Sequence, residues 1–182
     1  MVESARGRPR RVVRAGALDP FAELGTDAEL DPATVREIVR ICGRTDRARA
    51  LPIVRELVQR FDREGADLDA LTLDLGRRAR RLLMAVWAAG GDAVFLDGAA
   101  RLVPGVPPRL GPEIGKVLRR RKPQDIAAWA AATGASGSTA EDLVLALGAL
   151  VESLVDDLAL ALRVERATVE AATWSGGSVP SG

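Results

Sequence analysis

Histidine and tyrosine are absent from this chain of 182 residues, and cysteine occurs once. Histidine is the side chain whose unperturbed pKa lies between about pH 5 and 8, and it is the commonest metal ligand in proteins. Its absence excludes nucleophile schemes of the Ser-His-Asp and Cys-His types and every histidine-based zinc site. The sequence therefore predicts a protein that works by contact rather than by catalysis, with no cofactor and no metal.

Aromatic residues are also scarce, at 3% of the chain, so the core must be built from aliphatic side chains. The single cysteine, Cys42, cannot form an internal disulfide. It falls on the apolar side of an expected helix, which favours a role in core packing over a role as a reactive thiol.

Long uncharged apolar runs are missing as well. The most apolar region, residues 143–162, contains Glu152, Asp156 and Asp157, which argues against a transmembrane helix. The first residues are rich in arginine but lack the apolar stretch of a signal peptide. We expect a soluble cytoplasmic protein that makes no membrane contact.

Composition divides the chain into three parts. Residues 1–30 form a basic arm, with five arginines up to Arg14, followed by an acidic, turn-rich lead-in, and we expect them to be largely disordered. Residues 31–174 carry apolar residues at helical spacing and form a predicted single helical domain. Residues 175–182 (SGGSVPSG) form an expected flexible tail.

Within residues 31–174 we expect an all-α bundle of about six or seven helices, because no segment alternates in the manner of a strand. Asp31 is the expected cap of the first helix, with Pro32 at its first position and Gly43 at its end. Further helices are expected from about residue 51 to Gly65 and from 67 or 69 to Gly90. Shorter ones are expected over residues 92–103, 112–121 and 123–133.

The last expected helix is the longest. Ser138 and Glu141 have the spacing of a capping box, and no helix breaker other than Gly148 follows until Gly176. Two adjacent apolar stripes run along residues 143–162. Such a broad apolar face is typical of a helix at the centre of a bundle.

Charge is distributed unevenly although the formal net charge is only +1. Residues 76–122 hold eleven basic residues against three acids, and residues 139–174 hold seven acids against two arginines. Either these stretches pack together and neutralise each other, or the basic stretch forms a surface for a polyanion or an acidic partner. The candidate polyanion-binding residues are Arg77, Arg78, Arg80, Arg81, Arg119, Arg120, Arg121 and Lys122.

The segment from Leu102 to Val106 resembles the hairpin of the helix-hairpin-helix family, which reads Leu-Pro-Gly-Val-Gly before a helix. In that family the second glycine exposes backbone N–H groups to a DNA phosphate. Pro107, which has no N–H, stands at that position here, so we interpret the loop as a rigid connector between helices.

Two functional hypotheses follow. The first is a non-catalytic helical adaptor, scaffold or assembly subunit that acts through protein–protein contacts, either with a partner or with a second copy. The alternative is a nucleic-acid-associated accessory protein that uses the basic stretches 1–14, 77–81 and 119–122.

Overall fold

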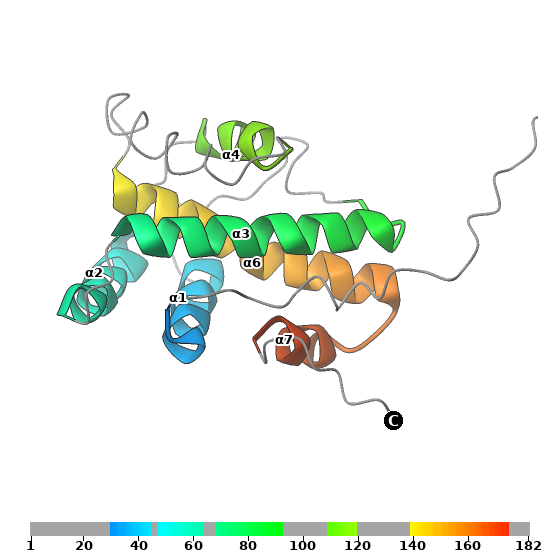
Figure 1. The fold of residues 1–182 in the computed structure, drawn as a ribbon, viewed down its shortest axis with the longest axis horizontal. Coiled ribbons are helices and arrows are strands. Elements are labelled where there is room, and N and C mark those ends of the chain that lie inside the picture. The colour runs from blue at the N-terminus through cyan, green and yellow to red at the C-terminus, as the bar shows by residue number, and fades with distance from the viewer. Residues whose placement is uncertain (1–29, 45–46, 64–67, 93–108, 120–138, 175–182) are drawn as a thin grey trace, which may run out of the picture.

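A computed structural model of the chain describes residues 30–44, 47–63, 68–92, 109–119 and 139–174, and these contain six helices and no strand (Figure 1). The helices are α1 (Pro32–Arg44), α2 (Arg47–Arg63), α3 (Leu68–Ala88), α4 (Leu110–Arg119), α6 (Ala140–Leu162) and α7 (Arg166–Trp174). The predicted all-α class is confirmed. The terminal arm and tail, the loop at 102–107, and nearly all of the expected helices at 92–103 and 123–133 lie outside the described residues.

Helix α6 is the centre of the fold, because it contacts each of the other five described helices. Every residue from Asp142 to Val151 is buried, and so are Leu154 and Leu158 further along. A helix with apolar stripes on more than one side is expected to be covered on more than one side. The central place predicted for this stretch is confirmed.

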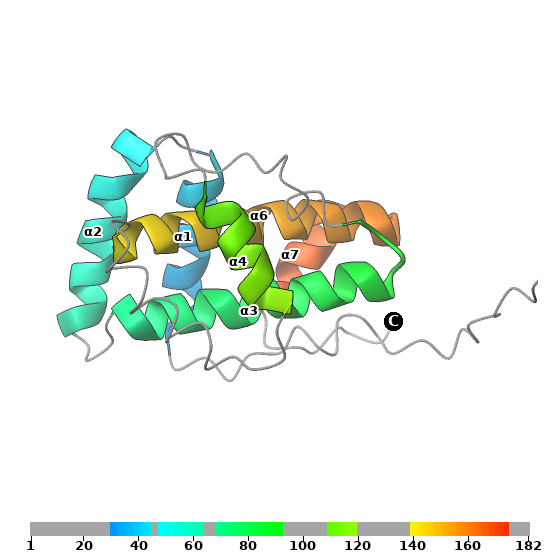
Figure 2. The same cartoon turned by 90° about the horizontal axis from the view of Figure 1, so that it is seen from above.

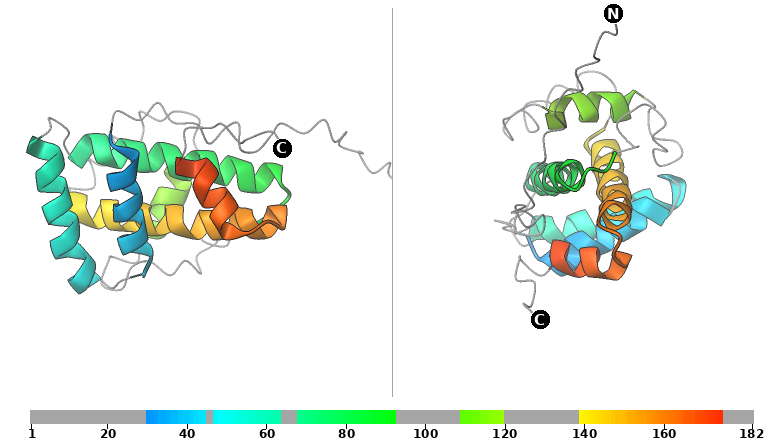
Figure 3. Two further views of the ribbon diagram at one scale, coloured as in Figure 1. Left: turned by 90° about the horizontal axis from the view of Figure 1, so that it is seen from below. Right: turned by 90° about the vertical axis from the view of Figure 1, so that its right-hand side faces the viewer.

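The helices form three layers. Helices α3 and α6 lie side by side and run in the same direction, with α4 across one face of the pair (Figures 1 and 2). On the opposite face α2, α1 and α7 cross the pair one after another along its length (Figure 3). At the end of α3, a Cβ added to Gly91 would come within 2.7 Å of the Cβ of Ala161. The C-terminal ends of α3 and α6 are therefore in close contact.

Helix α1 begins where the sequence predicts. The Asp31 carboxylate accepts hydrogen bonds from the N–H groups of Ala33 and Thr34, at 3.3 and 3.1 Å, and from the Thr34 hydroxyl at 2.6 Å. Pro32 is the first helical residue, a position where its missing N–H leaves no bond unmade. The apolar side of α1, on which Cys42 was expected, is buried in the core: Val35, Ile38, Val39 and Cys42.

Two glycines let α1 approach α6 closely. Gly43, expected to end α1, is its last residue but one, and a Cβ there would come within 2.7 Å of the Cβ of Glu152 on α6. One helical turn earlier along α6, a Cβ on Gly148 would lie 2.8 Å from both the Cβ and the Sγ of Cys42. Both glycines thus serve the packing of the two helices.

The C-terminal region departs from the sequence prediction. The cap of α6 is Thr139, paired reciprocally with Asp142, so the capping box lies one residue later than the expected Ser138 and Glu141. The last expected helix also ends well before Gly176, although the sequence offers no helix breaker other than Gly148 in between. It ends at Leu162, where Arg163 adopts left-handed backbone angles (φ 57°, ψ 40°), and α7 begins three residues further on.

Two prolines lie near helix starts. Pro52 is the sixth residue of α2, so it stands in the second turn rather than the first. Helix α4 begins at Leu110, two residues before the expected start, which places Pro112 in its first turn. The first four N–H groups of a helix have no partner within it, so Pro112 removes no helical hydrogen bond. Pro52 lies beyond those four and therefore removes one N–H donor from the hydrogen-bond ladder of α2.

Candidate interaction surfaces

Of the basic residues predicted to bind a polyanion, Arg78 is inside the protein. Its Nε donates to Oδ2 of Asp74 at 2.7 Å, and the two side chains are only 2% and 8% exposed. Its Nη1 donates to the main-chain oxygen of Thr173 at 3.3 Å, and its guanidinium lies 4.6 Å from the centre of the Trp174 ring. Arg78 therefore joins α3 to the end of α7, and the prediction that it meets a polyanion is wrong because its charge is already neutralised and enclosed.

The other three arginines of this run, Arg77, Arg80 and Arg81, are partly exposed. They lie on the side of α3 away from the row that carries Leu71, Leu75, Arg78 and Leu82, all of which are buried. The structure thus divides the run: one arginine serves the fold, and three stay at the surface.

Of the second basic cluster, residues 119–122, the described structure includes only the backbone of Arg119. The backbone of Arg119 ends helix α4. Arg120, Arg121 and Lys122 lie outside the described residues, as does the basic stretch 1–14. Lys116, one turn before the end of α4, is exposed.

An ion-pair network, which the sequence analysis did not predict, fixes α7 to the body. Arg166, the first residue of α7, donates to Asp156 at 2.7 Å and to Glu170 at 2.8 Å, and its Nη2 lies 2.5 Å from Oε1 of Glu152. Burial works against the charged guanidinium, but the three carboxylates outweigh it, so the pKa of Arg166 is raised. Part of this network has a local signal in the sequence. The i,i+4 spacing puts Glu152 and Asp156 on one face of α6, and it puts Arg166 next to Glu170 on α7.

Glu170 extends this network to α1. Arg36 donates to its Oε1 through Nε at 3.0 Å and through Nη2 at 2.7 Å. The two residues are 134 positions apart, so no local pattern reveals the contact. Arg36 and Arg166 thus bind one carboxylate from opposite sides, and the network spans α1, α6 and α7.

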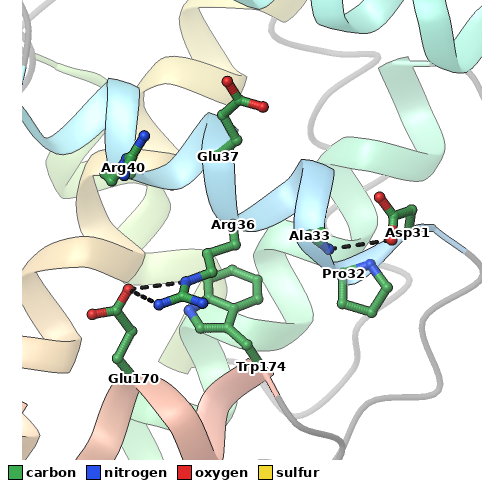
Figure 4. Close-up of a pocket in the computed structure, with 8 residues that line it drawn as sticks. All are labelled: Asp31, Pro32, Ala33, Arg36, Glu37, Arg40, Glu170 and Trp174. Atoms are coloured by element: carbon green, nitrogen blue, oxygen red, sulfur yellow. Dashed lines mark hydrogen bonds and ion pairs between the residues drawn. The ribbon is translucent and has the colours of Figure 1, made fainter. Parts of the chain in front are cut away.

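An open hollow of about 660 Å³ lies between α1 and the end of α7. Figure 4 shows Arg36 reaching from α1 to Glu170, with the Trp174 ring beside it. Its charged lining residues are Asp31, Arg36, Glu37, Arg40 and Glu170. Charges of both signs alternate here, so the lining favours no ligand of one charge, and the hollow is best described as the junction of the two helices.

Cys42 is a core residue. Its side chain is buried beside Gly148, and burial above all, with a smaller effect of Glu152, raises the pKa of its thiol to about 12. A thiol with so high a pKa carries almost no thiolate near neutral pH, and the thiolate is the reactive form. This geometry favours the packing role that the sequence analysis preferred.

Three large apolar side chains at or near the C-terminal ends of α3 and α6 are exposed. Trp87 near the end of α3 is 41% exposed, Leu160 near the end of α6 is 79% exposed, and Val164 just beyond it is 38% exposed. Gly91 and Ala161 bring the two helix ends into contact. We call these three residues the apolar end; the sequence analysis did not single them out.

Comparisons of the chain with protein-family models, with curated proteins and with solved structures find no significant match. Among the described residues, no group of three or more acidic or cysteine side chains is placed to hold a metal ion. No helix in those same segments has the length and apolarity needed to cross a membrane.

Proposed function

We propose that the chain is a non-catalytic helical scaffold or adaptor that acts through protein–protein contacts, self-association included. The observation that carries this proposal is the exposure of Leu160. On α6, whose other leucines are buried or partly buried, this one side chain is 79% exposed, and exposed Trp87 and Val164 come from the adjoining helix ends. A large apolar side chain left exposed on a helix whose other leucines are covered is a candidate point of protein contact.

The polar contacts of the structure support the same function. Arg78 and Asp74 join α3 to α7, and Arg166 and Glu170 join α7 to α6 and α1. These charged groups hold helices together. They leave the exposed ends and faces of the helices as the parts of the described structure available to a partner.

The experiment compares Leu160→Asp with Ile53→Asp, which alters an apolar residue of α2 that is 41% exposed. We expect sedimentation at rising concentration to show the wild type associating beyond its chain mass of 19.2 kDa. Leu160→Asp should abolish that association because it places a charge in the contact, and Ile53→Asp should leave it unchanged.

A second measurement covers a contact with a different protein. A photo-crosslinking residue at position 160, in cells that produce the protein naturally, should capture a defined partner, and the same residue at position 53 should not. A wild type that stays monomeric and forms no position-specific crosslink would refute the proposal.

The nucleic-acid alternative is left with fewer residues. Within the described structure it now depends on Arg77, Arg80 and Arg81, because Arg78 is buried. Protein–DNA interfaces are much more positively charged than protein–protein interfaces. Three arginines on one helix are a modest charge for such an interface, so we place this function second.

A further inference from the structure

The buried residues Leu71, Leu75, Arg78 and Leu82 form one row along α3, which we call the core row. A second row of residues lies on the opposite side of the helix. Seen along the helix in Figure 3, α3 has α6 beside it, α4 above and the α1–α7 layer below, and its remaining side faces away from every described helix. The residues on this side are separated by four, three, four and three positions: Leu73, Arg77, Arg80, Met84 and Trp87. We call them the outer row.

The spacing makes the outer row a straight line. Steps of three and four residues return to the same face of an α-helix, and they are the spacing of a coiled-coil seam. From Leu73 to Trp87 the line is about 21 Å long at about 1.5 Å per residue. Trp87 is exposed and the other four side chains are partly exposed, with Met84 also packed against the core, whereas Leu71, Leu75 and Leu82 of the core row have no exposure.

The chemistry along the row is ordered. Leu73 stands at one end, Met84 and Trp87 stand at the other, and the two arginines occupy the middle. Within the part of the chain that the structure describes, the side chains of Arg77 and Arg80 make neither a hydrogen bond nor an ion pair. An arginine covered by a partner must be given an anionic or hydrogen-bonding group, because an unpaired buried charge is costly.

This order distinguishes between two kinds of anionic partner. A nucleic acid offers a continuous line of phosphates and would leave Leu73, Met84 and Trp87 without apolar contacts. An amphipathic helix offers both kinds of group at the same spacing: apolar side chains at its ends and carboxylates between them. The observed row matches the helix better in charge and in apolar contacts.

We propose that the outer row of α3 docks an acidic amphipathic helix of a partner protein, with two carboxylates facing Arg77 and Arg80 and apolar residues facing Leu73, Met84 and Trp87. The inference rests on the proposed contact function and names the chemistry of one partner. The outer row shares Trp87 with the apolar end, so each surface is tested by a variant at residues that the other lacks: Arg77 and Arg80 for the outer row, and Leu160 for the apolar end.

The test measures fluorescence anisotropy of a labelled helical peptide of about 21 residues binding to the full chain. The peptide carries two glutamates flanked by leucines at the spacing of the row, and a second peptide carries lysines in place of the glutamates. We expect saturable binding of the first peptide only. The double variant Arg77→Glu/Arg80→Glu should raise its Kd on the order of tenfold, because two attractions become repulsions.

Arg40→Glu is the control, because it makes the same type of charge change at an exposed position of α1. It should leave the Kd of the peptide nearly unchanged. Leu160→Asp should also leave this Kd nearly unchanged, so the result at the apolar end and the result at the outer row can be told apart. Far-UV circular dichroism checks that each variant is folded. The proposal is overturned if the acidic peptide shows no saturable binding, or if Arg40→Glu weakens its binding as much as the double variant does. It is also overturned if a DNA duplex of about 20 base pairs binds more tightly than the peptide and loses as much affinity in Arg77→Glu/Arg80→Glu. A zero-length crosslink between the lysine of Arg77→Lys or Arg80→Lys and a carboxylate of the same chain would also overturn it, because the row would then have an internal partner.

Discussion

Arg78 and Asp74 form an ion pair inside the protein, with Nε and Oδ2 2.7 Å apart and with 2% and 8% of the two side chains exposed. The guanidinium also reaches the main-chain oxygen of Thr173 and the ring of Trp174. Asp74 and Arg78 lie one turn apart on α3, and the guanidinium that Asp74 shares with Thr173 and Trp174 fixes the end of α7. The stability of the α3–α7 contact therefore depends on a pair of charges that can only be removed together.

We expect Arg78→Met to lower the free energy of unfolding by about 3–5 kcal/mol, because it leaves the Asp74 carboxylate buried without its partner. The double variant Asp74→Leu/Arg78→Met should recover much of this loss, since no charge is left behind. Urea unfolding followed by circular dichroism measures both. Arg80→Met, on the exposed side of the same helix, should change stability by no more than about 0.5 kcal/mol. A double variant as unstable as the single one would contradict this account.

The cap of α1 predicts a pH dependence. Hydrogen bonds from the Thr34 hydroxyl, and then from the N–H groups of Ala33 and Thr34, lower the pKa of Asp31 below its ordinary value of 3.8. A lowered pKa in the folded state adds stability above the unfolded pKa, and this stability is lost as the pH falls through the folded pKa.

Asp31→Asn keeps a side-chain acceptor for the cap but removes the titrating group. We expect its melting temperature to fall below that of the wild type above about pH 4, and the difference to close as the pH falls through the pKa of Asp31 in the folded protein. Thr34→Val removes the strongest of the three hydrogen bonds, so it should move the midpoint of this change upward in pH. Melting curves over this range check both variants, and a difference that stays constant with pH would rule the explanation out.

The contact between Gly148 and Cys42 predicts that a better helix former will destabilise the protein. Alanine is favoured over glycine by about 1 kcal/mol inside a helix. At position 148, however, its Cβ would lie 2.8 Å from two atoms of Cys42, and the Cβ of Cys42 cannot move without α1. We expect Gly148→Ala to reduce the free energy of unfolding by about 1–3 kcal/mol, as overpacking usually does.

Leu160→Ala on the same helix is the matched control, because Leu160 is 79% exposed. Its effect on the free energy of unfolding should stay within about 0.5 kcal/mol. Unchanged or increased stability in Gly148→Ala would mean that α1 and α6 have room to separate.

The sequence was sufficient where a local pattern determines local structure. The Asp31–Pro32 start of α1 and the core row of α3 follow from capping chemistry and helical spacing, and both are present. The same spacing could have removed Arg78 from the surface cluster, since it continues the row of Leu71, Leu75 and Leu82. The four arginines within residues 77–81 hide this periodicity, because a cluster of like charges by itself indicates a surface site.

Other features required tertiary information. Ser138 with Glu141 and Thr139 with Asp142 have equivalent capping spacing, so local sequence does not choose between them. The Arg36–Glu170 pair joins residues that are distant in the chain. Gly43 marks the end of α1 to within one residue, but its close approach to Glu152 of α6 is not visible in the sequence.

The end of α6 was missed because neither glycine nor proline marks it. Arg163 has left-handed angles, its N–H donates to the Leu160 oxygen at 3.2 Å, and the Val164 N–H donates to the Ala159 oxygen at 3.1 Å. This is the hydrogen-bond pattern of a Schellman motif, in which glycine is the usual residue at the left-handed position. The arginine side chain is exposed there, so its backbone pays the steric cost without a packing gain.

We therefore expect Arg163→Gly to increase the free energy of unfolding by about 0.5–1 kcal/mol. The left-handed conformation costs an L-residue roughly 1–2 kcal/mol, and the greater freedom of glycine in the unfolded chain offsets part of the gain. Arg163→Ala removes the same side chain but keeps the Cβ, so it should give no such increase. Urea unfolding of the two variants separates backbone strain from the loss of the guanidinium. If the glycine variant is no more stable than the alanine variant, the turn between α6 and α7 is not strained at Arg163.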